Sequence, residues 1–170
     1  MKLKKKLLSM ILCFITCISL FSTVAFAAEE GDIVDGSILT HDQSAKDTQP
    51  LLPENSNNDS GISLYGTYLA NGSVLISNEG NGVVYISGQT NCLSTCKSVS
   101  VKIYLERLVN GAWQTVTSRS HTSNNTHFAS YGISLAVKKG YYYRVVGSHS
   151  VTNNGVTESN TSSTNAIYID

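Results

Sequence analysis

Residues 97–116 read KSVSVKIYLERLVNGAWQTV, and apolar side chains alternate with polar ones along the first half of this stretch. Successive side chains of a β-strand point to opposite faces, so the alternation predicts a strand with one buried face. The expected buried set is Val99, Val101, Ile103 and Leu105. The dipeptide Asn110-Gly111 follows, and it favours a two-residue hairpin turn because both positions adopt positive φ. The stretch therefore predicts a β-hairpin.

The register of this hairpin places apolar side chains on both of its faces. If pairing continues directly from the turn, Leu105 opposes Val116 on the inner face. On the outer face Leu108 opposes Trp113, close to Tyr104. This outer strip has two interpretations that the sequence leaves open. It packs within the protein, on its own sheet or a neighbouring loop, or it is a docking surface for a partner.

The chain after residue 61 repeats this kind of pattern. Short runs rich in Val, Ile, Tyr and Thr recur between Asn-Gly, Gly-Asn and Asn-Asn sequences, and no 3.6-residue period is sustained. We expect about seven strands and an eighth at the end. The expected ranges are 65–70, 73–77, 83–89, 98–109, 112–121, 128–137, 141–151 and 166–169. This regular spacing of strands and turns predicts an all-β fold, an antiparallel β-sandwich.

The first 27 residues have the three parts of a secretory signal peptide. A basic head, MKLKKK, precedes the apolar run 7–26, which ends at the small-residue site Ala25-Phe26-Ala27. We expect cleavage after Ala27 and secretion of residues 28–170, with no membrane span left. An uncleaved membrane anchor is the alternative, because about 20 apolar residues are enough to cross a bilayer.

Charge is unevenly distributed along the rest of the chain. Residues 28–61 hold eight acidic side chains, one basic one (Lys46) and both prolines. With few aromatic or β-branched residues, this segment cannot bury enough apolar surface to offset the entropy of ordering, so we expect a flexible acidic linker. Residues 62–170 hold seven basic and four acidic side chains, all nine tyrosines and the tryptophan. They form the expected folded domain, which is of ordinary size for one core.

Two segments of this domain resemble a known family. They are YLERLVNGAWQTV (104–116) and KKGYYYRVVGSHSVTNNGVTES (138–159). Both are similar to segments of a family of small secreted Gram-positive proteins of uncharacterised function, over about residues 62–170 and with a similar signal peptide ahead. The resemblance implies an immunoglobulin-like or fibronectin-like sandwich and implies no catalytic residue. The Cys…Trp…Cys spacing of antibody domains is absent from this sequence.

Cys92 and Cys96 are the only cysteines outside the expected signal peptide. An even pair in an extracellular chain predicts a disulfide, here one that closes a tight loop. Two free thiols are the alternative. A C-x-x-x-C redox or metal site is a third interpretation, but it needs a helix start or further ligands nearby, and the neighbouring sequence contains neither.

The titratable residues of the domain form no recognisable catalytic motif. The candidate bases are His121, His127 and His149, and the acids are Glu79, Glu106, Glu158 and Asp170. Neither G-x-S-x-G nor H-E-x-x-H occurs, and the segment NSNNDSG departs from the register of a calcium-binding EF-hand loop. We therefore expect a protein that is not an enzyme and that uses no metal or cofactor.

Basic residues surround a run of three tyrosines. Lys138, Lys139 and Arg144 flank residues 141–143, and basic and aromatic groups interleaved in this way bind single-stranded nucleic acid in some proteins. A secreted chain seldom meets that ligand. The structural interpretation is a turn that feeds a strand, in which Tyr143 packs inward as a tyrosine corner. We expect no nucleic-acid partner.

The expected function is that of a non-catalytic extracellular binding or surface-interaction module, whose partner is a protein or a glycan. Aromatic side chains give a large contact area and are enriched at interaction hot spots. The candidate binding residues are therefore Tyr104, Leu108, Trp113 and Tyr142. The alternatives are a secreted hydrolase that acts on glycans and a secreted antagonist or toxin-like protein. The sequence alone leaves the oligomeric state open.

Overall fold

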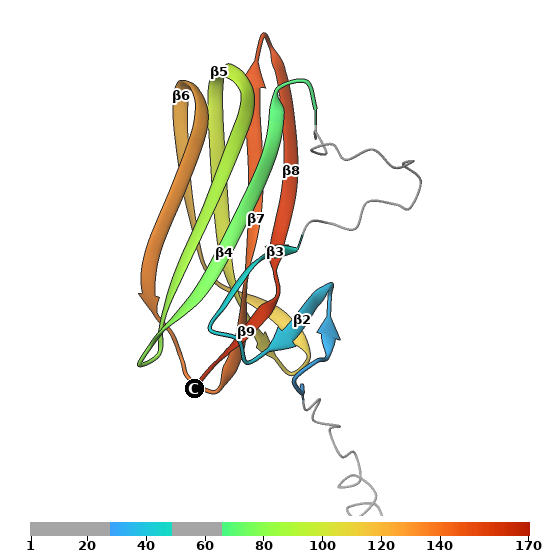
Figure 1. The fold of residues 1–170 in the computed structure, drawn as a ribbon, viewed down its shortest axis with the longest axis vertical. Helices are drawn as coiled ribbons and strands as arrows, with labels where there is room; N and C mark the ends of the chain where they lie inside the picture. The colour runs from blue at the N-terminus through green and yellow to red at the C-terminus, as the bar shows by residue number, and fades with distance from the viewer. Residues whose placement is uncertain (1–27, 49–65) are drawn as a thin grey trace, which may run out of the picture.

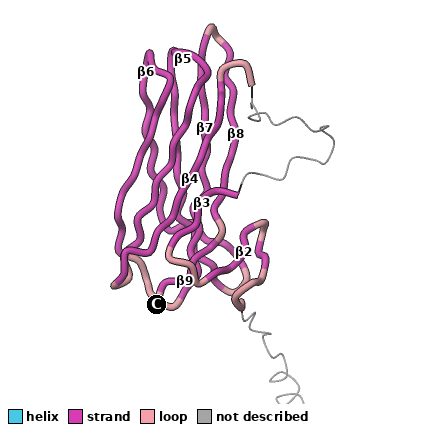
Figure 2. The backbone as a smooth tube through the Cα atoms, in the orientation of Figure 1, coloured by secondary structure: helices cyan, strands magenta, loops and turns pink. Residues whose placement is uncertain are grey.

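The computed structural model describes residues 28–48 and 66–170, in which every regular element is a β-strand (Figures 1 and 2). The strands are β1 Ile33–Val34, β2 Ser37–Thr40, β3 Ser44–Thr48, β4 Leu69–Gly80, β5 Val83–Val109, β6 Ala112–Ala136, β7 Tyr141–Asn153, β8 Val156–Thr164 and β9 Ala166–Ile169. These two ranges contain no helix that is long and apolar enough to cross a membrane. The all-β prediction is confirmed, whereas the signal peptide predicted for residues 1–27 lies outside the described residues.

The strands form one curled mixed sheet, a half-barrel. Its order is β1-β2-β9-β7-β8-β3-β4-β5-β6, with a further pairing between β7 and β5. Strands β2 and β9 are parallel, and the other pairs are antiparallel. These pairings join the described strands into one sheet, whereas the expected immunoglobulin-like sandwich has two separate sheets.

The curl results from the two long strands, β5 and β6. The first half of β5 pairs with β4 and the second half with β7, and a register shift separates the halves between Asn91 and Cys96. Figure 1 shows both β5 and β6 bending back at the same end of the molecule. The two halves of β5 then face one interior, because a side-chain carbon added to Gly88 would meet Ile103 at 2.5 Å.

Three breaks that the sequence predicted between strands are absent. The expected strands 83–89 and 98–109 are the two halves of β5, and the expected strands 112–121 and 128–137 are the two halves of β6. Likewise, β4 runs straight through Asn71-Gly72, where the sequence pattern indicated a turn. The glycine is needed there for packing instead, since a side-chain carbon on it would collide with the imidazole of His149.

Strand β8 has no counterpart among the predicted strands. Its sequence, VTESNTSST, is polar, so it lacks the apolar alternation on which the prediction relied. It forms because Asn154 and Gly155 make a hairpin turn, with φ of 49° and 79°, which pairs β8 with β7. Ser162 and Thr164 are its buried side chains.

Part of the acidic segment belongs to the fold. Residues 33–48, which we expected within a flexible linker over 28–61, form β1, β2 and β3, so that prediction is wrong for them. Strand β3 bridges β4 and β8, and β2 pairs with β9. Strands β1 and β2 form a hairpin around Asp35-Gly36, with φ of 48° and 76°. Composition misled because an average over the segment hides the short apolar pairs Ile33-Val34 and Ile38-Leu39, of which Leu39 is fully buried. Residues 49–61 lie outside the described residues.

The inward rows predicted from alternation form the core. The four side chains Val99, Val101, Ile103 and Leu105 have no exposed surface. Val99 packs in a second cluster with Leu69, Cys96, Ala129 and Val151. Val101, Ile103 and Leu105 pack with the inward side chains of β4, β7 and β9 and with the first half of β5. Tyr143 is buried in the same cluster, and its hydroxyl donates to the backbone oxygen of Lys138 (2.7 Å). This is the tyrosine corner that the sequence predicted.

The hairpin between β5 and β6 has the predicted turn but a different register beyond it. Leu108 pairs with Trp113 as expected. Leu105, however, pairs with Thr117, because a bulge leaves Val116 without a cross-strand partner and 45% exposed. Bulges are frequent at sheet edges, and β6 is the last strand in the sheet order.

Candidate functional site

The predicted binding strip is largely buried beneath the chain's own N-terminal strands. Leu108 and Tyr142 keep only 6% and 7% of their surface exposed, and they pack with Leu39 of β2. Trp113 is half-buried beside the same cluster. The structure thus brings three of the four predicted residues together, but under β1 and β2 instead of at an open surface.

Arg144 anchors β1 and β2 to this strip. Its guanidinium lies 4.4 Å from the centre of the Trp113 ring and forms ion pairs of 2.9 Å with both Asp35 and Glu106. The indole nitrogen of Trp113 donates to the backbone oxygen of Val34 (3.1 Å). These contacts hold β1 and β2 over part of the Trp113 ring and leave the rest of it exposed.

Tyr104 is the fourth residue of the predicted strip, and it lies apart from the cluster under β1 and β2. It is half-buried on the outer face of the second half of β5. The ammonium group of Lys102 stands 4.8 Å from the centre of its ring. A role of Tyr104 in binding stays a prediction.

Cys92 and Cys96 are free thiols, so the predicted disulfide is wrong. They flank the bend of β5 and belong to different ladders, since Cys92 pairs with Leu69 of β4 and Cys96 with Thr126 of β6. Burial, followed by the neighbouring Cys96, raises the pKa of Cys92 to about 12. A thiol that stays protonated is a poor nucleophile and a poor metal ligand. The described residues contain no group of three or more His, Cys, Asp or Glu side chains placed to hold a metal ion.

A histidine, a serine and a threonine form a hydrogen-bonded chain inside the half-barrel. Thr90 Oγ1 donates to the backbone oxygen of Ser100 (2.9 Å), so it accepts from His149 Nδ1 (2.9 Å). The other ring nitrogen of His149, Nε2, then accepts from the hydroxyl of Ser162 (2.8 Å). The sequence indicates that His149, like His121 and His127, is an exposed imidazole on a turn or strand end, and this expectation is wrong for His149, which is fully buried. Its partner Ser162 lies in β8, a strand that the sequence did not predict.

The Ser162–His149 pair is structural, although serine and histidine also form catalytic pairs in hydrolases. Burial lowers the pKa of His149 to about 4, so the imidazole is neutral at physiological pH. His149 and Thr90 have no exposed surface and Ser162 only 6%, which leaves no access for a substrate. Both ring nitrogens are satisfied, as expected of a buried polar group.

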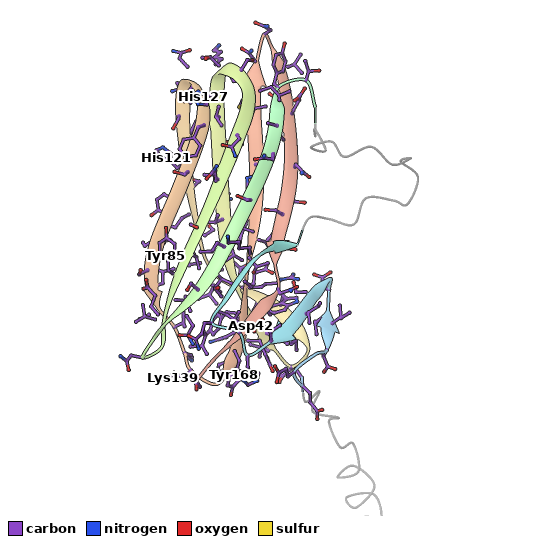
Figure 3. The ribbon with its side chains drawn as sticks, viewed as in Figure 1. Asp42, Tyr85, His121, His127, Lys139 and Tyr168 are labelled. Atoms are coloured by element: carbon purple, nitrogen blue, oxygen red, sulfur yellow. The ribbon has the colours of Figure 1, made fainter. Side chains whose placement is uncertain are left out.

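The outer face of β3, β4, β5 and β6 carries a hollow of about 400 Å³. One row of cross-strand neighbours runs across its floor: Lys46, Leu75, Ser87 and Gly132. The adjacent rows supply Tyr85 on one side and Gln89 on the other. Serine and glycine make up much of the lining, and these small side chains leave the floor low between Lys46, Tyr85 and Gln89. Tyr85 is labelled in Figure 3, beside β5 and β6.

Tyr85 is held in place at the rim of this hollow. A side-chain carbon added to Gly132 would meet the hydroxyl oxygen of Tyr85, so the ring lies across this glycine of the edge strand. An aromatic ring that covers an edge glycine stabilises the sheet, and it also keeps one orientation. The alternation of strand 83–89 places Tyr85 outward. The sequence alone does not show that small residues of β6, about 45 positions further along the chain, lie beside Tyr85, because this depends on how β5 and β6 pair.

Comparison with known proteins assigns the chain to a family but indicates no activity. No curated protein and no solved structure matches the chain. The model of a family of unknown function, DUF6147, matches residues 50–167. That range contains the lining of the hollow except Lys46, and β1, β2 and β3 precede it. Because the match covers more than half of the sequence, the chain belongs to the DUF6147 family.

Proposed function

We propose that the protein is a secreted, non-catalytic binding module whose extracellular partner, a protein or a glycan, lies in the hollow on the outer face of β4, β5 and β6. The observation that carries the proposal is this hollow of about 400 Å³, with Tyr85 fixed across Gly132 at its rim. Ligand sites are concave, with a few polar groups that set orientation. A fixed aromatic ring adds contact area with little further loss of entropy.

The placement of Glu106, Glu158 and His149 supports a role without catalysis. Glu106 pairs with Arg144. The carboxylate of Glu158 accepts hydrogen bonds from the backbone nitrogens of Thr67, Tyr68 and Leu69 (2.9, 2.9 and 2.8 Å). His149 is enclosed. The lining of the hollow contains Lys46, Tyr85 and Tyr131 and neither a carboxylate nor an imidazole.

Secretion and ancestry belong to the same proposal. The expected signal peptide supports export, and the resemblance of the hairpin and the tyrosine-rich strand supports a Gram-positive source. We also propose a distant relation to immunoglobulin-like sandwiches. The two halves of β5 enclose one core from opposite sides, as the two sheets of a sandwich do.

The experiment is a pull-down of the purified protein on Gram-positive cell walls, combined with a glycan array. We expect retention, and we expect Tyr85→Ala to weaken it about tenfold because the ring at the rim is lost. Tyr104→Ala is the rival variant, since Tyr104 lies on the other half of β5, outside the hollow. The proposal predicts that this variant is retained like the unmodified protein.

Other outcomes would contradict the proposal in different ways. Retention that depends on Tyr104 and not on Tyr85 would return the binding site to the strip predicted from the sequence. Release of soluble sugars from the walls during the incubation would favour the alternative of a glycan hydrolase. Inhibition of bacterial growth without retention would favour a secreted antagonist.

A further inference from the structure

The hollow continues into a longer polar face along the first half of β5. Its outward side chains are Tyr85, Ser87, Gln89 and Asn91. Three amides form a ladder, in which Gln89 Nε2 donates to Asn91 Oδ1 (3.0 Å) and Asn91 Nδ2 donates to Asn71 Oδ1 (2.6 Å). Phe128 of β6 pairs with Asn91 and is 39% exposed. The face thus has an aromatic ring at each end and hydrogen-bonding groups between them.

The length of this face suits an extended ligand. Tyr85 and Asn91 are six residues apart on one strand, which corresponds to about 20 Å at roughly 3.3 Å per residue. Phe128 lies at the level of Asn91, so the two rings are separated by a similar distance along the strand. A compact small molecule would fill the hollow beside Tyr85 and leave Phe128 uncovered, whereas a linear chain would reach both rings.

The side chains on the face favour a sugar polymer over a protein. Carboxamides and hydroxyls both donate and accept hydrogen bonds, as the many hydroxyls of a saccharide require. A protein partner is typically held by an apolar, desolvated centre with a polar rim. Here the arrangement is reversed, because the centre consists of serines, glycine and amides, and the aromatic rings lie at the ends.

Charge narrows the class of sugar polymer. Lys46 is the charged side chain in the lining of the hollow, and the lining contains no acidic side chain. Lys46 is exposed and stands on β3, in the same cross-strand row as Ser87 and at the side of the hollow opposite the edge strand β6. A carboxylate or phosphate group on the ligand would therefore be attracted there, while a cationic polymer would not.

We propose that this face, from Tyr85 to Phe128, binds an extended acidic polysaccharide. Sugar rings lie against the two aromatic side chains, their hydroxyls contact the amides of Gln89 and Asn91, and an acidic group lies near Lys46. The inference rests on the proposed function, since it names the ligand class of the same site.

The test is calorimetric titration of the purified protein with hexasaccharides of equal length. Three are acidic (hyaluronan, oligogalacturonate and oligoalginate), and three are neutral (chitin, cellulose and mannan oligomers). We expect at least one acidic hexasaccharide to bind about tenfold more tightly than its disaccharide, as contact with a second ring requires. Tyr85→Ala and Phe128→Ala should each weaken this binding about tenfold, and Lys46→Gln should remove the preference for acidic over neutral chains.

Two further variants separate binding from folding. Tyr85→Phe keeps the ring over Gly132 and should bind like the unmodified protein. Val116→Ala changes an exposed side chain on the other half of β6 and serves as the matched control. Thermal melting of each variant verifies that the fold persists. A loss of binding by Tyr85→Ala with an unchanged melting temperature supports the inference.

The inference is overturned if no acidic hexasaccharide binds, if the neutral chains bind equally well, or if Tyr85→Ala and Phe128→Ala both leave binding unchanged. Its failure is distinguishable from failure of the proposed function. If cell walls retain the protein through Tyr85 while all six hexasaccharides fail, the binding module stands and the ligand class is wrong. If cell walls and arrays retain nothing, the proposed function itself is contradicted.

Discussion

His149 illustrates at the level of a single residue how this core accommodates a polar side chain. Its ring is fully buried, its two nitrogens are bonded to the hydroxyls of Thr90 and Ser162, and Gly72 leaves room for it. Burial penalises the charged form of the ring, and neither partner carries a negative charge that would offset this penalty. Folding therefore depends on this residue remaining unprotonated.

We predict that acidification destabilises the protein through His149. Its pKa lies at about 4 when folded, against 6.5 for the exposed group. Above pH 6.5 both states are neutral and stability is complete. As the pH falls towards 4, the unfolded state binds a proton that the folded state excludes, which costs about 3 kcal/mol of unfolding free energy. Urea denaturation at pH 7 and pH 4.5 measures this loss.

The control for that measurement is His149→Gln, which has no proton to bind in this range. Its unfolding free energy should fall much less between the two pH values, whatever its starting stability. His121→Gln, in contrast, removes an exposed imidazole and should keep the loss seen in the unmodified protein. An equal loss in all three proteins would mean that other groups cause it.

A second prediction at this scale concerns Trp113 and Tyr104. Trp113→Ser removes a hydrogen bond to Val34 and the surface on which Arg144 rests, so it should cost about 2 kcal/mol and lower the melting temperature by several degrees. Tyr104→Ser should cost less than about 1 kcal/mol, because only Lys102 contacts its ring in this way. Calorimetric melting of both variants tests the difference, and equal melting temperatures would contradict it.

At the level of the element, the β1–β2 hairpin is held by specific polar contacts as well as by apolar burial. Its turn forms through Asp35-Gly36 at positive φ, and Leu39 places a fully buried side chain on the strip. Arg144 then joins the hairpin to β5 and β7 through two carboxylates. The question raised by the outer apolar strip is thereby answered: the chain itself covers most of that strip.

The two carboxylates should differ in their contribution to stability. Arg144 is 7% exposed and Glu106 18%, while Asp35 is 77% exposed. Arg144→Ala leaves the partly buried carboxylate of Glu106 without its partner and should cost about 3 kcal/mol. Asp35→Asn removes a solvent-screened pair and should cost less than about 1 kcal/mol. Urea denaturation of the two variants measures both values, and the reverse order would contradict this account.

At the level of the whole molecule, residues N-terminal to the matched family range complete the sheet. Strand β3 pairs with β4 through its first three residues and with β8 through its last two, so it joins the two sides of the half-barrel. Strand β2 extends the sheet beyond β9. The family match begins at residue 50, after both strands. The fold of this chain therefore includes strands that the family model does not cover.

Hydrogen exchange distinguishes a β3 that is paired in the sheet from the flexible acidic linker that composition predicted for residues 28–61. The backbone amides of residues 44–48 should exchange slowly because β3 is paired on the sheet, at a rate nearer to that of β4 than to that of an unpaired chain. Fragment-resolved mass spectrometry after deuterium labelling provides the measurement. Exchange of 44–48 within the fastest phase would show that β3 is not stably paired.

The sequence by itself determined what depends on neighbours along the chain. Alternation with a period of two identified the strands, placed Val99, Ile103 and Tyr143 inward, and paired Leu108 with Trp113 across the Asn110-Gly111 turn. These features follow from local backbone geometry, in which side chains change face at every residue. Such features can be predicted from the sequence wherever one face of a strand is apolar. Strand β8 was not predicted because neither of its faces is apolar.

The tertiary structure alone decided which strands lie beside one another. It placed β1 and β2 over the strip, brought Ser162 to His149, put the unbonded Cys92 and Cys96 on separate ladders, and set Tyr85 over Gly132. Each of these contacts joins separate strands or separate ladders, so it depends on how β5 and β6 bend and pair. The alternation in a strand records which face is buried, and it contains no information about what covers that face.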